Sequence, residues 1–136
     1  MKSKLCSICF DETVSDPCSI CADSARDESL IAVFAQPFDT MLLKRSSYKG
    51  RHYVLHGVIS PREGIGPDQL RIRELVERVR QNTIRELTFW LPKTMEGNAT
   101  SQFIWIELDK AGLIRPTRAV SSINDLPITT DFKWNN

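Results

Sequence analysis

The chain has 136 residues, of which 41% are apolar and 26% charged, a composition that is ordinary for a folded protein and excludes global disorder. No run approaches the ~18 apolar residues of a membrane-spanning helix, and the N-terminus lacks the apolar stretch of a signal peptide, so we expect a cytoplasmic protein. The net charge of +1 is unevenly spread, because residues 44–85 hold 10 basic and 4 acidic residues whereas residues 1–43 hold 3 and 7.

The N-terminal segment is defined by its cysteines. Cys6, Cys9, Cys18 and Cys21 form two C-x2-C pairs separated by eight residues. Four thiolates at this spacing complete a closed tetrahedral site, which is typical of structural zinc. Disulfides, a redox dithiol or an iron–sulfur cluster stay open as alternatives, although disulfides are disfavoured in the cytoplasm. Because the segment has too few apolar residues for a core of its own, we expect Zn²⁺ to fold residues 1–24 as a zinc finger.

Beyond the cysteines, short apolar strands alternate with helices. Residues 30–35 form the first predicted strand, and Pro37 opens a predicted helix. The residues that this helix should present on one apolar face are Phe38, Met41 and Leu42. Residues 53–55 are the second predicted strand, and the turn residues of 60–67 predict a loop.

A longer helix is predicted to start near Asp68. Its buried stripe, at helical spacing, consists of Ile72, Leu75, Val76 and Val79. Residues 87–91 are the third predicted strand, and residues 94–111 the third helix, which Gly112 should stop. Leu113 and Ile114 indicate a weak fourth strand, and the chain beyond residue 118 gives no firm signal.

The predicted strands are apolar throughout and alternate with helices, which is typical of a parallel sheet covered on both faces. We therefore predict an α/β fold with a mainly parallel sheet flanked by helices over residues 25–120. The zinc finger of residues 1–24 precedes this domain, and a tail of residues 121–136 without firm assignment follows it.

Several segments together resemble the RecR family of bacterial recombination mediators. They are residues 6–21, 26–31, 37–39, 53–57, 60–72 and 94–100, so the resemblance covers about residues 5–115. The resemblance implies a C4 zinc finger followed by a Toprim domain, the fold shared with topoisomerases and primases. It also implies a role in recombinational DNA repair, in which the protein helps to load RecA onto single-stranded DNA with RecO and RecF as partners.

Two features depart from the family pattern. The family begins with a helix-hairpin-helix module, whereas Cys6 nearly opens this chain. The family's C-terminal Gly-Leu-Pro-x-Gly-Gly motif should fall near residues 121–125, but these read Ser-Ser-Ile-Asn-Asp, so the motif is lost. We expect a truncated or degenerate member. Its oligomeric state stays open between monomer, dimer and ring, and we expect no membrane partner.

The positions of the Toprim acidic residues bear on catalysis. Catalytic members hold Mg²⁺ with a Glu after the first strand and an Asp-x-Asp-x-Asp after the third. The residues that this chain has at these positions are Ala35, Pro92, Thr94 and Glu96. One carboxylate does not assemble a firm Mg²⁺ site, so we expect no enzymatic activity; a metal-dependent nuclease or primase is the alternative that these residues disfavour.

The basic block of residues 44–85 contains the candidate DNA contacts, which are Arg62, Arg71, Arg73, Arg78 and Arg80. Glu74 and Glu77 lie at helical spacing from Arg78 and Arg80, so part of the block is equally interpretable as a salt-bridged solvent face. The hypotheses are weak, sequence-independent DNA binding and a reduced protein-interaction module that no longer binds DNA. His52 and His56 are interpreted either as a metal or catalytic pair or as ordinary half-buried histidines.

Overall fold

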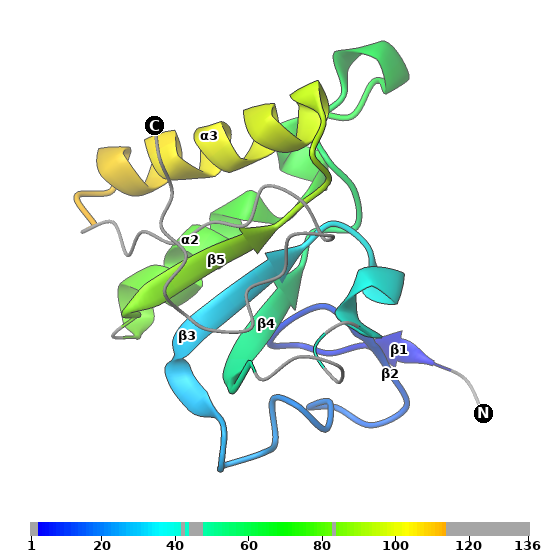
Figure 1. Cartoon of the computed structure of the whole chain (residues 1–136), viewed down its shortest axis with the longest axis vertical. Coiled ribbons are helices and arrows are strands. Elements are labelled where there is room, and N and C mark those ends of the chain that lie inside the picture. The colour runs from blue at the N-terminus through cyan, green and yellow to red at the C-terminus, as the bar shows by residue number, and fades with distance from the viewer. Residues whose placement is uncertain (1–2, 42, 44–47, 83, 114–136) are drawn as a thin grey trace.

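The computed structural model describes residues 3–41, 43, 48–82 and 84–113, and Figure 1 shows how their elements are arranged. Residues 3–26 form an irregular segment around a small antiparallel pair, β1 (Lys4–Leu5) and β2 (Glu12–Thr13). None of the described helices combines the length and the apolarity that crossing a bilayer requires.

A three-stranded parallel sheet follows, with the strand order β4-β3-β5. Its strands are β3 (Asp27–Phe34), β4 (Gly50–Val54) and β5 (Glu86–Trp90). In the register of the sheet, Val33 of β3 lies beside Tyr53 of β4 and Phe89 of β5. Residues 30–34 of β3 and all residues of β4 and β5 are buried, as expected for a parallel sheet with both faces covered.

The two helices of the larger core are α2 (Ile72–Gln81) and α3 (Met95–Lys110). They pack on the face of the sheet that carries Ile31, Val33, Tyr53, Leu87 and Phe89. The opposite face carries Leu30, Ala32, Phe34 and Trp90, against which Leu43 and Tyr48 pack. The predicted α/β fold, with a mainly parallel sheet preceded by a cysteine cluster, is thus confirmed.

The prediction for the segment after β3 was wrong in part. Pro37–Thr40 is a short 3-10 helix, η1, whose first turn is closed by the Asp39 carboxylate accepting from the Gln36 N–H at 3.2 Å. Phe38 is 76% exposed and Met41 48% exposed, so neither forms the predicted buried face. Leu43 is buried instead, because the tighter turn shifts the side chains that point to the sheet. Leu42 lies outside the described residues.

The helix expected near Asp68 begins later. Pro67–Gln69 forms a 3-10 turn, η3, and Arg71 has a left-handed backbone with φ 53°, so α2 starts only at Ile72. Within α2, Ile72, Leu75 and Val79 are buried as predicted, whereas Val76 is half-buried.

The last helix was predicted nearly to the residue. Thr94 caps α3 by accepting the Gly97 N–H at 3.0 Å, and Gly112 follows its end with φ 74°. Leu113 is not part of a strand, and Ile114 lies outside the described residues.

Candidate metal centre and its contact with the sheet

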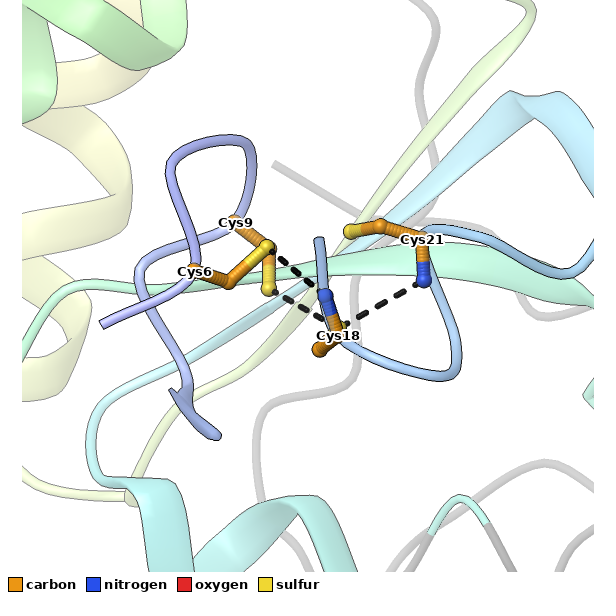
Figure 2. A group of neighbouring side chains, drawn as sticks. All are labelled: Cys6, Cys9, Cys18 and Cys21. Carbon is orange, nitrogen blue, oxygen red and sulfur yellow. Dashed lines mark hydrogen bonds between the residues drawn. The ribbon is translucent and has the colours of Figure 1, made fainter. Parts of the chain in front are cut away.

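The four cysteine side chains converge from two loops, as Figure 2 shows. Their sulfur atoms all lie within 4.8 Å of one another, and those of Cys9 and Cys18 are 3.7 Å apart. A tetrahedral zinc site with Zn–S bonds of about 2.3 Å has sulfur–sulfur edges of about 3.8 Å. The cluster therefore has the size and the ligand number of a structural zinc site.

Backbone N–H groups point at these sulfurs. Four donate at 3.4 Å: Ile8 and Cys18 to Cys6 Sγ, Asp11 to Cys9 Sγ, and Cys21 to Cys18 Sγ. Such donors stabilise thiolates, which are the metal-binding form of cysteine. The N–H donors around the sulfurs therefore support the same conclusion as the sulfur–sulfur distances, namely a cation bound by thiolates.

The thiols of Cys9, Cys18 and Cys21 differ in pKa. Hydrogen bonds from Cys9 and Cys18, with a smaller contribution from the positive charge of Arg78, lower the pKa of the Cys21 thiol to about 5. The hydrogen bond to Cys21 and burial raise the pKa of Cys9, and burial raises that of Cys18 to about 11. Of these three cysteines, Cys21 therefore ionises most readily.

An aspartate ties the two cysteine loops together. The Asp16 carboxylate accepts from the backbone N–H of Ser7 at 2.9 Å and from its hydroxyl at 3.0 Å. These hydrogen bonds hold the pKa of Asp16 below its usual value. No second group of three or more metal-ligating side chains lies together in the part of the chain that the structure describes.

We call the segment of residues 6–10 the first knuckle. Three consecutive carbonyl oxygens of the first knuckle are bonded from the Toprim side of the molecule. Arg78 Nη1 donates to the carbonyl of Ile8 at 3.3 Å, and the Val54 N–H donates to that of Cys9 at 2.8 Å. His56 Nε2 contacts the carbonyl of Phe10. The finger is thus hydrogen-bonded directly to β4 and α2.

The two histidines contact different parts of the finger. His52 is fully buried, with Nε2 2.9 Å from Asp11 Oδ2 and 3.6 Å from Cys9 Sγ. His56 is half-buried, and its contact is the Phe10 carbonyl. They are not brought together in a metal-ligating group, because the cluster of such side chains contains the cysteines alone among the described residues.

Phe10 is an apolar contact between the finger and the sheet face that carries Tyr53. Its ring packs edge-on against Tyr53 with centroids 5.5 Å apart, and the Arg71 guanidinium carbon lies 4.6 Å from its centroid. The Tyr53 hydroxyl donates to the Arg71 carbonyl at 2.8 Å, which joins the three residues into one unit.

The candidate DNA contacts are dispersed. Arg62 lies 3.7 Å from Glu96, and Arg80 lies 3.2 Å from Glu77, as the spacing predicted. Arg78 does not bond to Glu74 as predicted, because its guanidinium turns to the carbonyls of Ile8 and His52. Arg71 and Arg73 are brought together, in a groove between α2 and α3 that Asp68, Glu74 and Glu107 also line.

The positions of the Toprim acidic residues meet at the carboxyl end of the sheet. Ala35 is buried directly after β3, and Thr94 is engaged as the cap of α3. Pro92 is half-buried. Glu96 accepts from the Ser60 hydroxyl at 3.3 Å in addition to its contact with Arg62, so its carboxylate is bound to the loop after β4.

Sequence reasoning missed the residues that join the finger to the sheet, which are Phe10, Asp11 and Tyr53. Only Phe10 carried a signal, as an aromatic residue directly after a cysteine pair in a segment poor in apolar residues. Asp11 and Tyr53 carried none, because their partners lie far along the chain.

Comparison with known proteins gives a match to the Toprim domain over residues 29–119. Curated relatives are named "Recombination protein RecR". The chain is 40% identical over 134 residues to that of Desulfatibacillum aliphaticivorans, which covers 98% of this chain and 65% of the relative. It is 41% identical to that of Pelotomaculum thermopropionicum, covering 96% and 64%, and 43% identical to that of Syntrophotalea carbinolica, covering 98% and 65%. The chain thus spans slightly less than two thirds of their length.

Proposed function

Because this chain belongs to the Toprim domain family and is a homologue of RecR, we propose that it acts in recombinational DNA repair. Its role is to help load RecA onto single-stranded DNA together with RecO- and RecF-type partners. The observation that carries this proposal is a four-cysteine cluster bonded to a Toprim sheet, in a chain about 40% identical to RecR proteins.

The metal part of the proposal assigns Cys6, Cys9, Cys18 and Cys21 as the ligands of one Zn²⁺. When bound, the ion contributes folding energy rather than chemistry, since four thiolates leave no open position for water or substrate. Thiolate ligands of this kind stay reduced in the cytoplasm, where we place the protein. Residues 1–24 would form the finger, 25–120 the Toprim-like domain and 121–136 a tail.

We assign no catalytic role to the Toprim domain. Cleavage or synthesis of a phosphodiester requires a carboxylate cluster that holds Mg²⁺. The chain offers Glu96 alone at the corresponding positions, and Ser60 and Arg62 already engage its carboxylate. These contacts support a scaffold role for the domain.

The DNA part of the proposal assigns weak, sequence-independent contacts to Arg62, Arg71, Arg73, Arg78 and Arg80. Arg71 and Arg73 are best supported, because no carboxylate lies within ion-pair distance of either in the described residues, whereas Arg62 and Arg80 are paired. These pairs favour a second candidate function, a protein-interaction module that contacts recombination partners without binding DNA.

Gel-shift titrations separate the two candidates. The full chain is titrated into single- and double-stranded DNA, with and without a RecO-type partner, and RecA assembly on single-stranded DNA is followed in parallel. The repair proposal predicts retardation at low salt and faster RecA assembly in the presence of the partner. Partner binding without any DNA retardation would favour the interaction module, and loss of both would contradict the two candidates together.

A further inference from the structure

Among the described residues other than glycine, the left-handed backbone conformations gather at one place. Three residues other than glycine have a positive φ: Phe10 at 64°, His56 at 65° and Arg71 at 53°. His56 contacts the carbonyl of Phe10, and the Arg71 guanidinium lies over its ring. Left-handed backbone is unfavourable for residues with a side chain and persists where surrounding contacts enforce it, which makes this contact a candidate functional element.

His56 and Arg71 also mark the two ends of one loop. The loop of residues 57–70 joins β4 to α2 and contains the 3-10 turns η2 (Pro61–Glu63) and η3 (Pro67–Gln69). Phe10 therefore contacts both ends of the loop at once, with its carbonyl at one end and its ring at the other.

Phe10 itself is held by the cysteine site. It directly follows the second cysteine of the first pair, and its N–H donates to the Cys6 carbonyl at 2.9 Å. The carbonyls of Ile8 and Cys9 fix the same segment to Arg78 and to Val54. The position of the ring thus depends on the fold of the first knuckle, and therefore on the cysteine site that stabilises this fold.

We propose that Phe10 is a positioning residue that couples the four-cysteine site to the loop of residues 57–70 and to the guanidinium of Arg71. Folding of the first knuckle places Phe10, whose carbonyl holds the His56 end of the loop and whose ring holds the Arg71 end. The flat guanidinium stacks on the aromatic face and is thereby held in one orientation.

The consequence for DNA rests on the proposed function. In that function Arg71 contacts phosphates of the DNA backbone, and Phe10 orients it for this contact. Asp68, Glu74 and Glu107 line the same groove, so the contact with phosphate is weak and an arginine left free to turn toward these carboxylates would lose it. Metal binding at the cysteines would then regulate a phosphate contact that the cysteines do not touch.

Hydrogen exchange of the full chain tests the coupling without DNA. Phe10→Leu keeps apolar volume and removes the aromatic face, whereas Phe10→Tyr keeps both. We expect Phe10→Leu, at one zinc per chain by elemental analysis, to exchange amides of residues 66–70, at the Arg71 end of the loop, about tenfold faster than the unmodified chain. Phe10→Tyr should exchange like the unmodified chain. A chelator added to the unmodified chain should speed the exchange of the same amides as Phe10→Leu does. Unchanged exchange in zinc-loaded Phe10→Leu overturns the proposal.

A second pair of variants keeps the test decisive if Phe10→Leu loses zinc. Arg71→Gln removes the stacked guanidinium and leaves the first knuckle intact, and Arg73→Gln, two residues later in α2, is its matched control. We expect faster exchange at residues 66–70 in Arg71→Gln and no change in Arg73→Gln. Equal exchange in the two variants contradicts the role of the stacked pair.

The DNA step has its own measurement. Each phosphate contact contributes about 0.9 to the slope of log affinity against log salt for duplex DNA. We expect Phe10→Leu and Arg71→Gln to lower this slope by about one contact, and Phe10→Tyr to leave it unchanged. An unchanged slope in Phe10→Leu overturns the DNA step. Absence of DNA binding by the unmodified chain overturns the proposed function, while the exchange results still decide the coupling.

Discussion

The backbone N–H of Val54, at the end of β4, donates to the carbonyl oxygen of Cys9 at 2.8 Å. β4 is an edge strand of the described sheet, and this bond places a cysteine-bearing segment against that edge. The cysteine cluster and the Toprim sheet are therefore expected to lose structure together rather than independently.

Arg78 should contribute more to stability than its helix neighbour Arg80. Arg78→Ala removes the donor to the Ile8 and His52 carbonyls, and we expect a loss of about 1–3 kcal/mol in the free energy of unfolding by urea titration. Arg80→Ala removes only the exposed pair with Glu77 and should change it by no more than about 0.5 kcal/mol. Equal effects of the two variants would show that Arg78 is a surface charge.

Gly97 is required by close packing at the start of α3. A Cβ at this position would lie within van der Waals overlap of the Pro92 backbone, 3.1 Å from its carbonyl carbon and closer still to its oxygen. We expect Gly97→Ala to destabilise the chain by about 3 kcal/mol in thermal or urea unfolding. Asn98→Ala, one residue on and exposed, should be neutral or slightly stabilising because alanine favours helix. Stability within about 0.5 kcal/mol of the unmodified chain for Gly97→Ala would refute this packing.

Asp27 links the starts of β3 and β5. Its carboxylate accepts from the hydroxyl and the N–H of Ser29 at 2.6 and 2.9 Å and pairs with Arg85 at 2.9 Å. These contacts, those of Ser29 first, hold the pKa of Asp27 below its ordinary value of 3.8. The carboxylate therefore stabilises the fold above that value, and the contribution is lost as the pH falls through the lowered pKa.

An NMR titration of the Asp27 carboxyl measures its pKa directly. The pH dependence of unfolding would be ambiguous, because acid also protonates the cysteine thiolates. Ser29→Ala should raise the Asp27 pKa toward 3.8 more than Arg85→Ala does. The reverse order would mean that the ion pair, and not the serine, is the main cause.

The Toprim domain should neither cut nor copy DNA. With Ala35 and Thr94 at two of the acidic positions and Glu96 bound to Ser60, Mg²⁺ should bind weakly, and DNA incubated with the protein and Mg²⁺ should stay intact. Cleavage that depends on Mg²⁺ and disappears in Glu96→Ala would contradict the scaffold role.

Local patterns were sufficient to predict much of the fold. The apolar runs around Val33 and Phe89 became β3 and β5, and the Thr94 and Gly112 signals bounded α3, because strand burial and helix caps are encoded by neighbouring residues. The cysteine spacing likewise predicted a cluster that the structure brings together.

Contacts between distant segments were beyond reach of those patterns. Glu74 is the helical neighbour of Arg78, yet Arg78 bonds to Ile8, which lies 70 residues away. A carbonyl group is present at every residue, so no residue type marks it as a partner. Phe38 was predicted to be buried from its spacing and is exposed, because a 3-10 turn replaces the expected α-helix there.

Zinc content with X-ray absorption is the most direct test, because the finger, its contact with β4 and the proposed control of the loop all depend on a metal at the cysteines. Freshly purified protein should contain one zinc per chain with four sulfur neighbours at about 2.3 Å. Replacement of Cys21 by serine should release the metal and unfold the segment of residues 3–26. Well under one zinc per chain in the unmodified protein, or a shell containing nitrogen or oxygen ligands, would contradict the account.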